Sequence, residues 1–134
     1  MVDVASEPIR VVVVDDNPAI VARATAVLTP TCAVVGTAHD GPRALETVMT
    51  LRPDVVVLDV SMPGMNGFDV AAGLVQAGSG AAIVFLSVHV EKEFVKAAHV
   101  VGAAGYVVKS WLGSDLPAAV RAASAGERFV SPVR

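Results

Sequence analysis

The run Val-Val-Val-Leu-Asp at residues 55–59 constrains the fold of this chain more than any other stretch. Consecutive branched apolar residues are typical of a strand buried on both faces of a sheet, because a strand with one exposed face alternates apolar and polar residues. The run ends at a carboxylate, and a loop rich in Pro and Gly follows it. Asp59 is therefore predicted at the carboxyl end of a central strand, where parallel α/β sheets bind their ligands.

Strand-like and helix-like patterns alternate along the rest of the chain. Apolar runs predict strands at residues 9–14, 32–38, 55–59, 82–86 and 106–108. Apolar residues at helical spacing follow each strand; we expect Asp40 to cap the second helix and Ser114 the last one, with Pro117 in its first turn. This alternation indicates the α/β class: a flavodoxin-like (βα)5 doubly wound sandwich, its five-stranded parallel sheet in the order 2-1-3-4-5.

Length and composition fit one globular domain. For the 134 residues we expect a flexible lead at 1–8, the domain at 9–126 and the start of a linker at 127–134. The 54% of hydrophobic residues excludes a disordered chain, and no apolar run reaches the roughly 18 residues of a membrane span. The N-terminus lacks a secretory pattern, so we expect a soluble cytoplasmic protein with no membrane partner. A net charge of −3 argues against direct nucleic-acid contact by this domain.

Polar side chains follow most of the predicted strands. In the predicted strand order they converge on one crevice, and they are Asp15, Asp16, Asp59, Ser87 and Lys109. Two carboxylates about 4 Å apart repel by about 4 kcal/mol at an effective dielectric near 20, so the cluster requires positive charge. Lys109 supplies one charge, and a divalent cation is predicted to supply the rest.

The donor set indicates the kind of cation. Oxygen ligands suit Mg²⁺, whereas the Cys and His residues of a zinc site are missing. We predict Asp16 and Asp59 as direct ligands, the backbone carbonyl of Ser61 as a third, and Asp15 in an outer or water-mediated role. Such a site is suited to phosphoryl transfer onto Asp59 itself.

Ser87 and Lys109 complete that prediction. Lys109 would neutralise the phosphoryl oxygens while Ser87 donates a hydrogen bond to one of them. Each residue alone has an ordinary structural explanation, since single aspartates commonly cap helices and single lysines are usually exposed; their joint occurrence at the strand ends favours a site. Tyr106 is either a half-buried strand aromatic or a switching residue. The histidines are more typical of a surface, although His89 could gate water access to the site.

These elements together resemble the receiver domain of two-component response regulators, over residues 9–125. The resemblance rests on Asp15-Asp16, on Asp59 with Met62-Pro63-Gly64-Met65-Asn66-Gly67, and on Ser87, Tyr106 and Lys109. It implies that Asp59 takes a phosphoryl group from a sensor histidine kinase in the presence of Mg²⁺. The domain would then be a phosphoacceptor that catalyses its own phosphorylation and dephosphorylation, not an enzyme with a separate substrate. The family also implies that Ser87 and Tyr106 switch the surface formed by the fourth helix, fifth strand and fifth helix.

Two further positions refine the resemblance. Receivers commonly carry proline in a cis bond after the lysine of the fifth strand, but Ser110 stands here, and a cis bond before it costs about 3 kcal/mol. Residues 118–132 resemble the NarL/FixJ-type subgroup, whose receivers lead into a helix-turn-helix output domain. This implies transcription regulation through a DNA-binding domain outside this chain, with a homodimer on phosphorylation as a further state that the family allows.

Other functions remain as alternatives. A stand-alone receiver would act by protein binding or by phosphorelay. A phosphohydrolase resembling the haloacid dehalogenases needs a second aspartate where Ser61 stands, and a dinucleotide-binding domain needs a glycine-rich turn where residues 15–18 read Asp-Asp-Asn-Pro. A receiver that has lost its site is disfavoured by the complete residue set. Cys32 and Trp111 are interpreted as packing residues.

Overall fold

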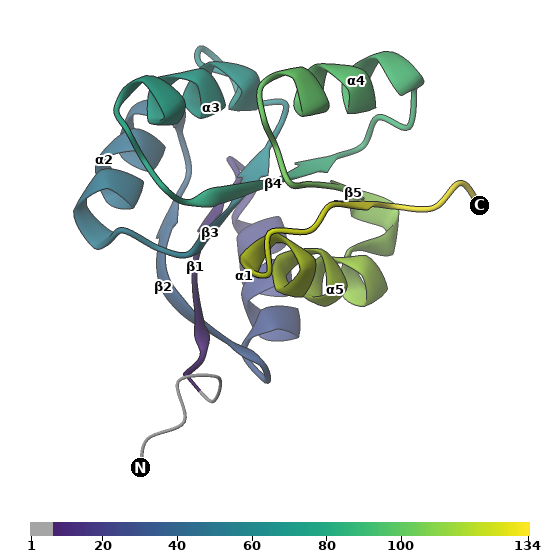
Figure 1. The fold of residues 1–134 in the computed structure, drawn as a ribbon, viewed down its shortest axis with the longest axis horizontal. Helices are drawn as coiled ribbons and strands as arrows, with labels where there is room; N and C mark the ends of the chain where they lie inside the picture. Colours follow the sequence, from purple (N-terminus) through teal and green to yellow (C-terminus); the bar gives the residue numbers. More distant parts are fainter. Residues whose placement is uncertain (1–6) are drawn as a thin grey trace.

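A single parallel sheet lies between two layers of helices in the computed structural model, which describes residues 7–134 (Figure 1). The predicted flexible lead at 1–8 lies outside the described residues apart from its last two positions. The strands are β1 (Ile9–Val14), β2 (Cys32–Ala38), β3 (Val55–Asp59), β4 (Ala82–Ser87), β5 (Gly105–Val108) and β6 (Phe129–Val130). The helices are α1 (Pro18–Leu28), α2 (Gly41–Leu51), α3 (Gly67–Gln76), α4 (Lys92–Val100) and α5 (Leu112–Ser124), and a 3₁₀ turn at Lys109–Trp111 precedes α5.

The sheet order is β2-β1-β3-β4-β5-β6, and every neighbouring pair is parallel. This confirms the predicted flavodoxin-like class and the order of its first five strands. The prediction of five strands was short by one, because Phe129 pairs with Gly105 and Val130 with Tyr106. Residues 127–134, expected as the start of a linker, therefore place a strand at the edge of the sheet.

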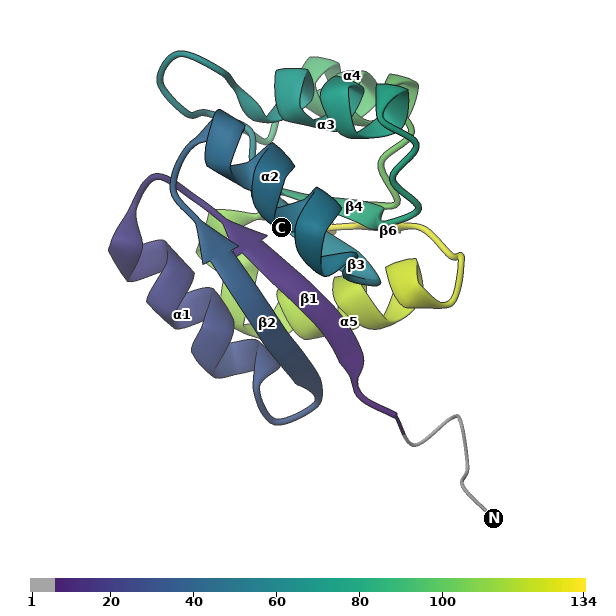
Figure 2. The same ribbon diagram turned by 90° about the vertical axis from the view of Figure 1, so that its left-hand side faces the viewer.

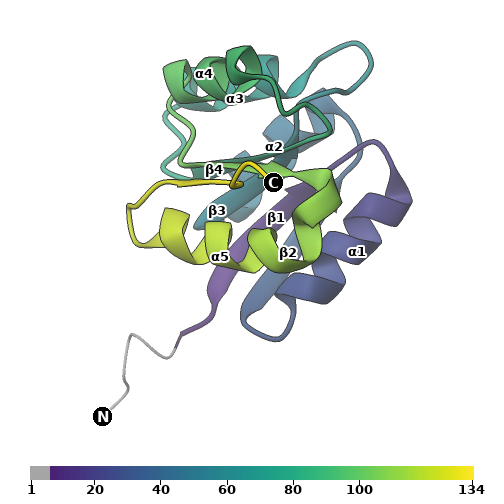
Figure 3. The same ribbon diagram turned by 90° about the vertical axis from the view of Figure 1, so that its right-hand side faces the viewer.

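The two faces of the sheet each have their own apolar core. Val12 and Val14 of β1 pack with α2, α3 and α4, whereas Val11 and Val13 pack with α1 and α5. Figures 2 and 3 show these two helix layers on opposite sides of the strands. Successive side chains of a strand point to opposite faces, so a strand between two cores must be apolar at every position. This is the physical reason for the unbroken apolar runs in the sequence.

Side chains set where several helices begin. Asp40 accepts a hydrogen bond from the backbone N–H of Arg43 at 2.8 Å, as predicted for the cap of α2. The prediction for Ser114 was wrong, because the 3₁₀ turn runs directly into α5 and the helix already begins at Leu112. Pro117 consequently lies one turn deeper in the helix than expected. The Ser114 hydroxyl instead donates to the backbone carbonyl of Trp111 at 3.3 Å.

Two residues interpreted as packing residues differ in their exposure to solvent. Cys32 is buried in the core beneath α1, as expected. Trp111 is 43% exposed, and the guanidinium of Arg134 lies 4.1 Å from the centre of its ring. The tail reaches Trp111 because β6 runs parallel to β5 and carries the last residues along its edge toward its carboxyl end. No cis peptide bond occurs among residues 7–134, so the bond between Lys109 and Ser110 is trans.

Candidate functional site

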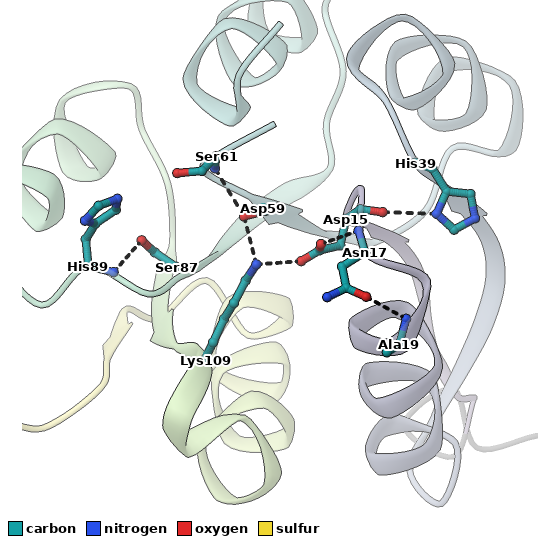
Figure 4. A network of polar contacts seen from close by, with 9 residues as sticks. All are labelled: Asp15, Asn17, Ala19, His39, Asp59, Ser61, Ser87, His89 and Lys109. Atoms are coloured by element: carbon teal, nitrogen blue, oxygen red, sulfur yellow. Dashed lines mark hydrogen bonds and ion pairs between the residues drawn. The ribbon is translucent and has the colours of Figure 1, made fainter. Parts of the chain in front are cut away.

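Asp59 ends β3 and is 1% exposed, at the carboxyl edge of the sheet (Figure 4). One carboxylate oxygen, Oδ1, accepts the backbone N–H of Ser61 at 3.1 Å and lies 3.1 Å from the ammonium of Lys109. The other oxygen, Oδ2, is buried and has no hydrogen-bond partner within residues 7–134. A buried carboxylate oxygen without a partner is costly, so this atom marks a place where a ligand can bind.

The loop after Asp59 is packed tightly against the end of β3. A Cβ atom at Gly67 would lie 2.2 Å from the backbone oxygen of Asp59, so only glycine fits there. The Gly67 N–H donates to the carbonyl of Val60 at 2.9 Å, and the side chain of Asn66 accepts from Asp69 N–H at 2.9 Å to start α3. These contacts fix the loop that borders the carboxylate.

Lys109 bridges two buried carboxylates from different strands. It begins the 3₁₀ turn after β5, and its ammonium lies 2.9 Å from Asp15 Oδ2 and 3.1 Å from Asp59 Oδ1 (Figure 4). Burial lowers the pKa of Lys109, but hydrogen bonding and charge from Asp15 and Asp59 outweigh it and raise that pKa above its usual value. Lys109 is therefore held as a cation that ties β1, β3 and β5 together.

The pKa of Asp59 is raised to about 7. Burial is the main cause, and the negative charge of Asp15 adds to it; Lys109 and the Ser61 N–H act in the opposite direction. One lysine is thus insufficient to compensate the carboxylates that meet here. Additional positive charge next to Asp59 would stabilise its ionised form.

Three carboxylates can share one cation at this edge of the sheet. Ligand oxygens of Asp15, Asp16 and Asp59 all lie within 4.8 Å of one another; Asp15 and Asp59 are buried and Asp16 is exposed. An all-oxygen cluster that is open on the Asp16 side fits a hard divalent cation that keeps part of its water. The division into direct ligands and the outer role of Asp15 stay predictions, as does the ligand role of the Ser61 carbonyl.

Ser87 and Tyr106 are linked through the backbone of His89. The hydroxyl of Ser87 accepts the His89 N–H at 3.0 Å, and the Tyr106 hydroxyl donates to the His89 carbonyl at 2.8 Å. Tyr106 is 2% exposed, so the half-buried alternative was wrong, and burial raises the pKa of its phenol. The imidazole of His89 stacks on Phe94, with ring centres 3.9 Å apart. A gating role for His89 stays a prediction.

Two neighbours of Asp15 were not assigned to the site from the sequence. The Asn17 N–H donates to Asp15 Oδ1 at 2.9 Å, while the Asn17 side chain accepts from Ala19 N–H to cap α1. His39, at the end of β2, places Nδ1 3.1 Å from the backbone oxygen of Asp15. An Asn before a Pro is a typical helix start and could have revealed Asn17. Nothing in the sequence pattern links His39 to Asp15.

Comparison with known proteins agrees with this geometry. Residues 11–121 match the family model described as response regulator receiver domain. The chain is 35% identical over 127 residues to the nitrate/nitrite response regulator protein NarL of Escherichia coli K12. It is 38% identical over 129 residues to the probable transcriptional regulatory protein NarL of Mycobacterium tuberculosis H37Rv. These alignments cover 93% and 94% of this chain but 59% of each relative.

Solved structures with the same fold include receiver domains. The signal receiver domain of NarL from M. tuberculosis superposes with a TM-score of 0.85 at 36% identity, covering 90% of this chain and 99% of that domain. A LuxR-family two-component response regulator from Aurantimonas sp. SI85-9A1 gives a TM-score of 0.88 at 32% identity, covering 94% and 91% of the two chains. This chain belongs to the response regulator receiver domain family.

A search of the described helices for a transmembrane segment found none with the necessary length and apolar character.

Proposed function

We propose that this domain receives a phosphoryl group on Asp59 from a sensor histidine kinase and changes its surface in response. The observation that carries the proposal is the Asp59 carboxylate: Oδ1 is held by Lys109 and Ser61, and the buried Oδ2 is left without a partner. A carboxylate arranged in this way has lone pairs available for bond formation and a cation beside them. It is therefore suited to attack an electrophilic phosphorus.

The transfer step follows from this arrangement. A carboxylate oxygen of Asp59 attacks the phosphorus of the phosphodonor, a new O–P bond forms, and the bond from phosphorus to the donor nitrogen breaks with its electron pair going to that nitrogen. The ammonium of Lys109 stabilises the negative phosphoryl oxygens, as does a hydrogen bond from the Ser87 hydroxyl. The product is an aspartyl phosphate that the same domain can hydrolyse.

Mg²⁺ is the cation that we assign to Asp15, Asp16 and Asp59. When bound it supplies the positive charge that Lys109 alone does not provide against the three carboxylates and the incoming phosphoryl group. Support for this assignment comes from the close approach of the three carboxylates and from the unpartnered Asp59 oxygen.

The response is proposed to pass through Ser87, His89 and Tyr106. If the Ser87 hydroxyl turns to the phosphoryl group, the His89 N–H loses its acceptor, and the Tyr106 hydroxyl is bound to that same residue. The segment between β4 and α4 can thus exist in two arrangements, which a dianionic group would bias. The surface of α4, β5 and α5 would then be altered.

The output is proposed to be transcription regulation by a DNA-binding domain outside this chain. Two of the relatives are named as regulators of transcription or of the nitrate/nitrite response, and the chain spans 59% of their length. A stand-alone receiver that acts by protein binding or by phosphorelay is the alternative.

Intact mass spectrometry tests the phosphoryl transfer. Incubation with acetyl phosphate and Mg²⁺ should add a single phosphoryl group to the wild type, and the gain should vanish with chelator or in Asp59→Asn. Glu46→Gln is the control, because Glu46 is an exposed acidic residue on α2 that takes part in none of the contacts of the site. Persistent labelling of the same peptide in Asp59→Asn would overturn the assignment of the phosphoacceptor.

Lys109→Ala separates phosphorylation from the response. This variant should retain Mg²⁺ binding through the aspartates but lose the change in the NMR spectrum of α4 when acetyl phosphate is added. A full wild-type spectral response in Lys109→Ala would contradict the role given to Lys109.

A further inference from the structure

A groove of about 570 Å³ lies between α4, the end of β5 and the C-terminal residues 130–134. Its floor includes Tyr106 and Val108, and apolar side chains of Val95, Trp111 and Val130 also line it. Sites for small organic ligands typically measure about 300–1,000 Å³ and are mainly apolar with a few placed polar groups. The groove has the size and the lining of such a site.

One wall of the groove is built by the tail and is held in place by Asp115. The guanidinium of Arg134 donates to both carboxylate oxygens of Asp115, at 2.8 and 2.9 Å, and the Ser131 hydroxyl donates to Asp115 Oδ2 at 2.7 Å. Ser131 in turn accepts the N–H of Val108 at 3.0 Å. The guanidinium also covers the ring of Trp111. The wall is therefore preformed, and little ordering is needed when a ligand enters.

The charged side chains that line the groove are all cationic. Lys92, Val95, Lys96 and His99 lie at positions i, i+3, i+4 and i+7 of α4, so they form one face of the helix toward the groove. No Asp or Glu is among the lining residues, and within residues 7–134 no carboxylate lies within ion-pair distance of either lysine. Arg134 is already paired with Asp115. Two unpaired ammonium groups thus border an apolar groove in a chain whose net charge is −3.

We propose that this groove binds a small amphipathic organic acid. Its carboxylate would lie between Lys92 and Lys96, and its aliphatic or aromatic body would pack on Val95, Val130 and Trp111. A protein segment is a less suitable occupant, because the tail closes one side and leaves a volume of ligand size. None of the residues around the Asp59 carboxylate lines the groove, so the proposal goes beyond the phosphoacceptor function.

The single tryptophan of the chain makes the proposal directly measurable. Trp111 lines the groove, so its fluorescence should report a ligand there without any label. Titration of the full chain with decanoate should give a saturable change in fluorescence at a concentration well below that at which decanoate forms micelles. Decanol, with the same apolar body and no charge, should bind at least tenfold more weakly.

Substitutions test whether Lys92 and Lys96 contribute to the affinity for decanoate. The double variant Lys92→Gln/Lys96→Gln should weaken decanoate binding about tenfold, whereas Arg121→Gln should bind as the wild type does, because Arg121 is exposed on α5 and does not line the groove. Asp59→Asn should also bind normally, which distinguishes this proposal from the phosphoacceptor function. Circular dichroism at each ligand concentration verifies that the fold is retained.

Four outcomes would overturn the proposal. The first is a fluorescence change that does not saturate, and the second is equal binding of decanoate and decanol. The third is an affinity that is unchanged in Lys92→Gln/Lys96→Gln. Saturable binding of an acidic peptide without any binding of decanoate would likewise reject the small acid and identify the groove as a protein-docking surface.

Discussion

Two buried aspartates, Asp59 at the end of β3 and Asp115 on α5, have opposite electrostatics. Asp59 is 1% exposed, its pKa is raised to about 7, and one of its oxygens has no partner. Asp115 is 5% exposed, but hydrogen bonds from Arg134 lower its pKa to about 2, with further bonds from Ser131 and Ser114 that outweigh the effect of burial. The negative charge of a buried aspartate is thus only partly compensated at Asp59 and is fully compensated at Asp115.

The difference shows that one domain can keep a candidate reactive carboxylate, Asp59, apart from a carboxylate that only stabilises the fold, Asp115. Asp59, the proposed phosphoacceptor, lies close to the like charge of Asp15 and shares one lysine with it, which costs stability in the free protein. The carboxylate that only holds structure has a donor for each oxygen. Ser131 joins the two regions, since it bonds both Asp115 and the N–H of Val108, the residue before Lys109.

Asp115→Asn should have the largest destabilising effect. It removes a buried anion that accepts several hydrogen bonds, so we expect a loss of about 2 kcal/mol in the free energy of unfolding at pH 7. Because the folded pKa of Asp115 lies below its unfolded value, this contribution is present above pH 4 and is lost as the pH falls toward 2. Urea denaturation at pH 7 measures the loss, with Glu127→Gln, at an exposed position just after α5, as the control. If Asp115→Asn is as stable as the wild type, Asp115 does not stabilise the fold and the contrast with Asp59 is wrong.

Asp59→Asn should have the opposite sign, with a size that depends on pH. The folded pKa is raised, so the folded state binds a proton more tightly than the unfolded chain does, and stability declines as the pH rises from about 4 to 7. Replacement by Asn removes this decline, so the variant should be more stable than the wild type at pH 8 and its advantage should be smaller at pH 5. Urea denaturation of both proteins at the two pH values, with chelator present, measures it. A variant that is less stable than wild type at pH 8 would show that the pair with Lys109 outweighs burial.

Ser131→Ala should have the smallest effect of the three. Loss of the bonds to Asp115 and to the Val108 N–H is expected to cost about 1 kcal/mol, whereas Ser124→Ala, at an exposed position at the end of α5, should be neutral. Amide hydrogen exchange should be faster at Val108 in Ser131→Ala. If exchange at Val108 is unchanged, the tail does not support the end of β5.

Much of the site could be predicted because its residues occupy strand ends. Asp59 and Ser87 end strands whose apolar runs are unmistakable, and Asp15 and Lys109 directly follow such runs, so the parallel topology brings all four to one edge. The contacts of His39 with Asp15 and of the tail with Asp115 could not be predicted in this way. They depend on side-chain directions in irregular segments that have no periodicity.

The start of α5 is a second feature that the sequence pattern did not predict correctly. The sequence offers Ser114 as a cap, but the 3₁₀ turn after β5 allows α5 to begin at Leu112, and Leu112 and Leu116 are fully buried there. Burial of apolar side chains against the sheet outweighs the contribution of about 1 kcal/mol from a single capping bond.

The order of strands and helices, the parallel sheet and the gathering of three aspartates with a lysine were determined by the sequence alone. Apolar periodicity is a local and repetitive signal, and few folds accommodate buried strands that alternate with helices in this way. Only the tertiary structure decided that residues 129–130 join the sheet and that Asp115 holds the tail. It also decided that one oxygen of Asp59 stays without a partner. These features depend on contacts between residues distant in sequence, where small differences in packing and in hydrogen-bond geometry select one arrangement.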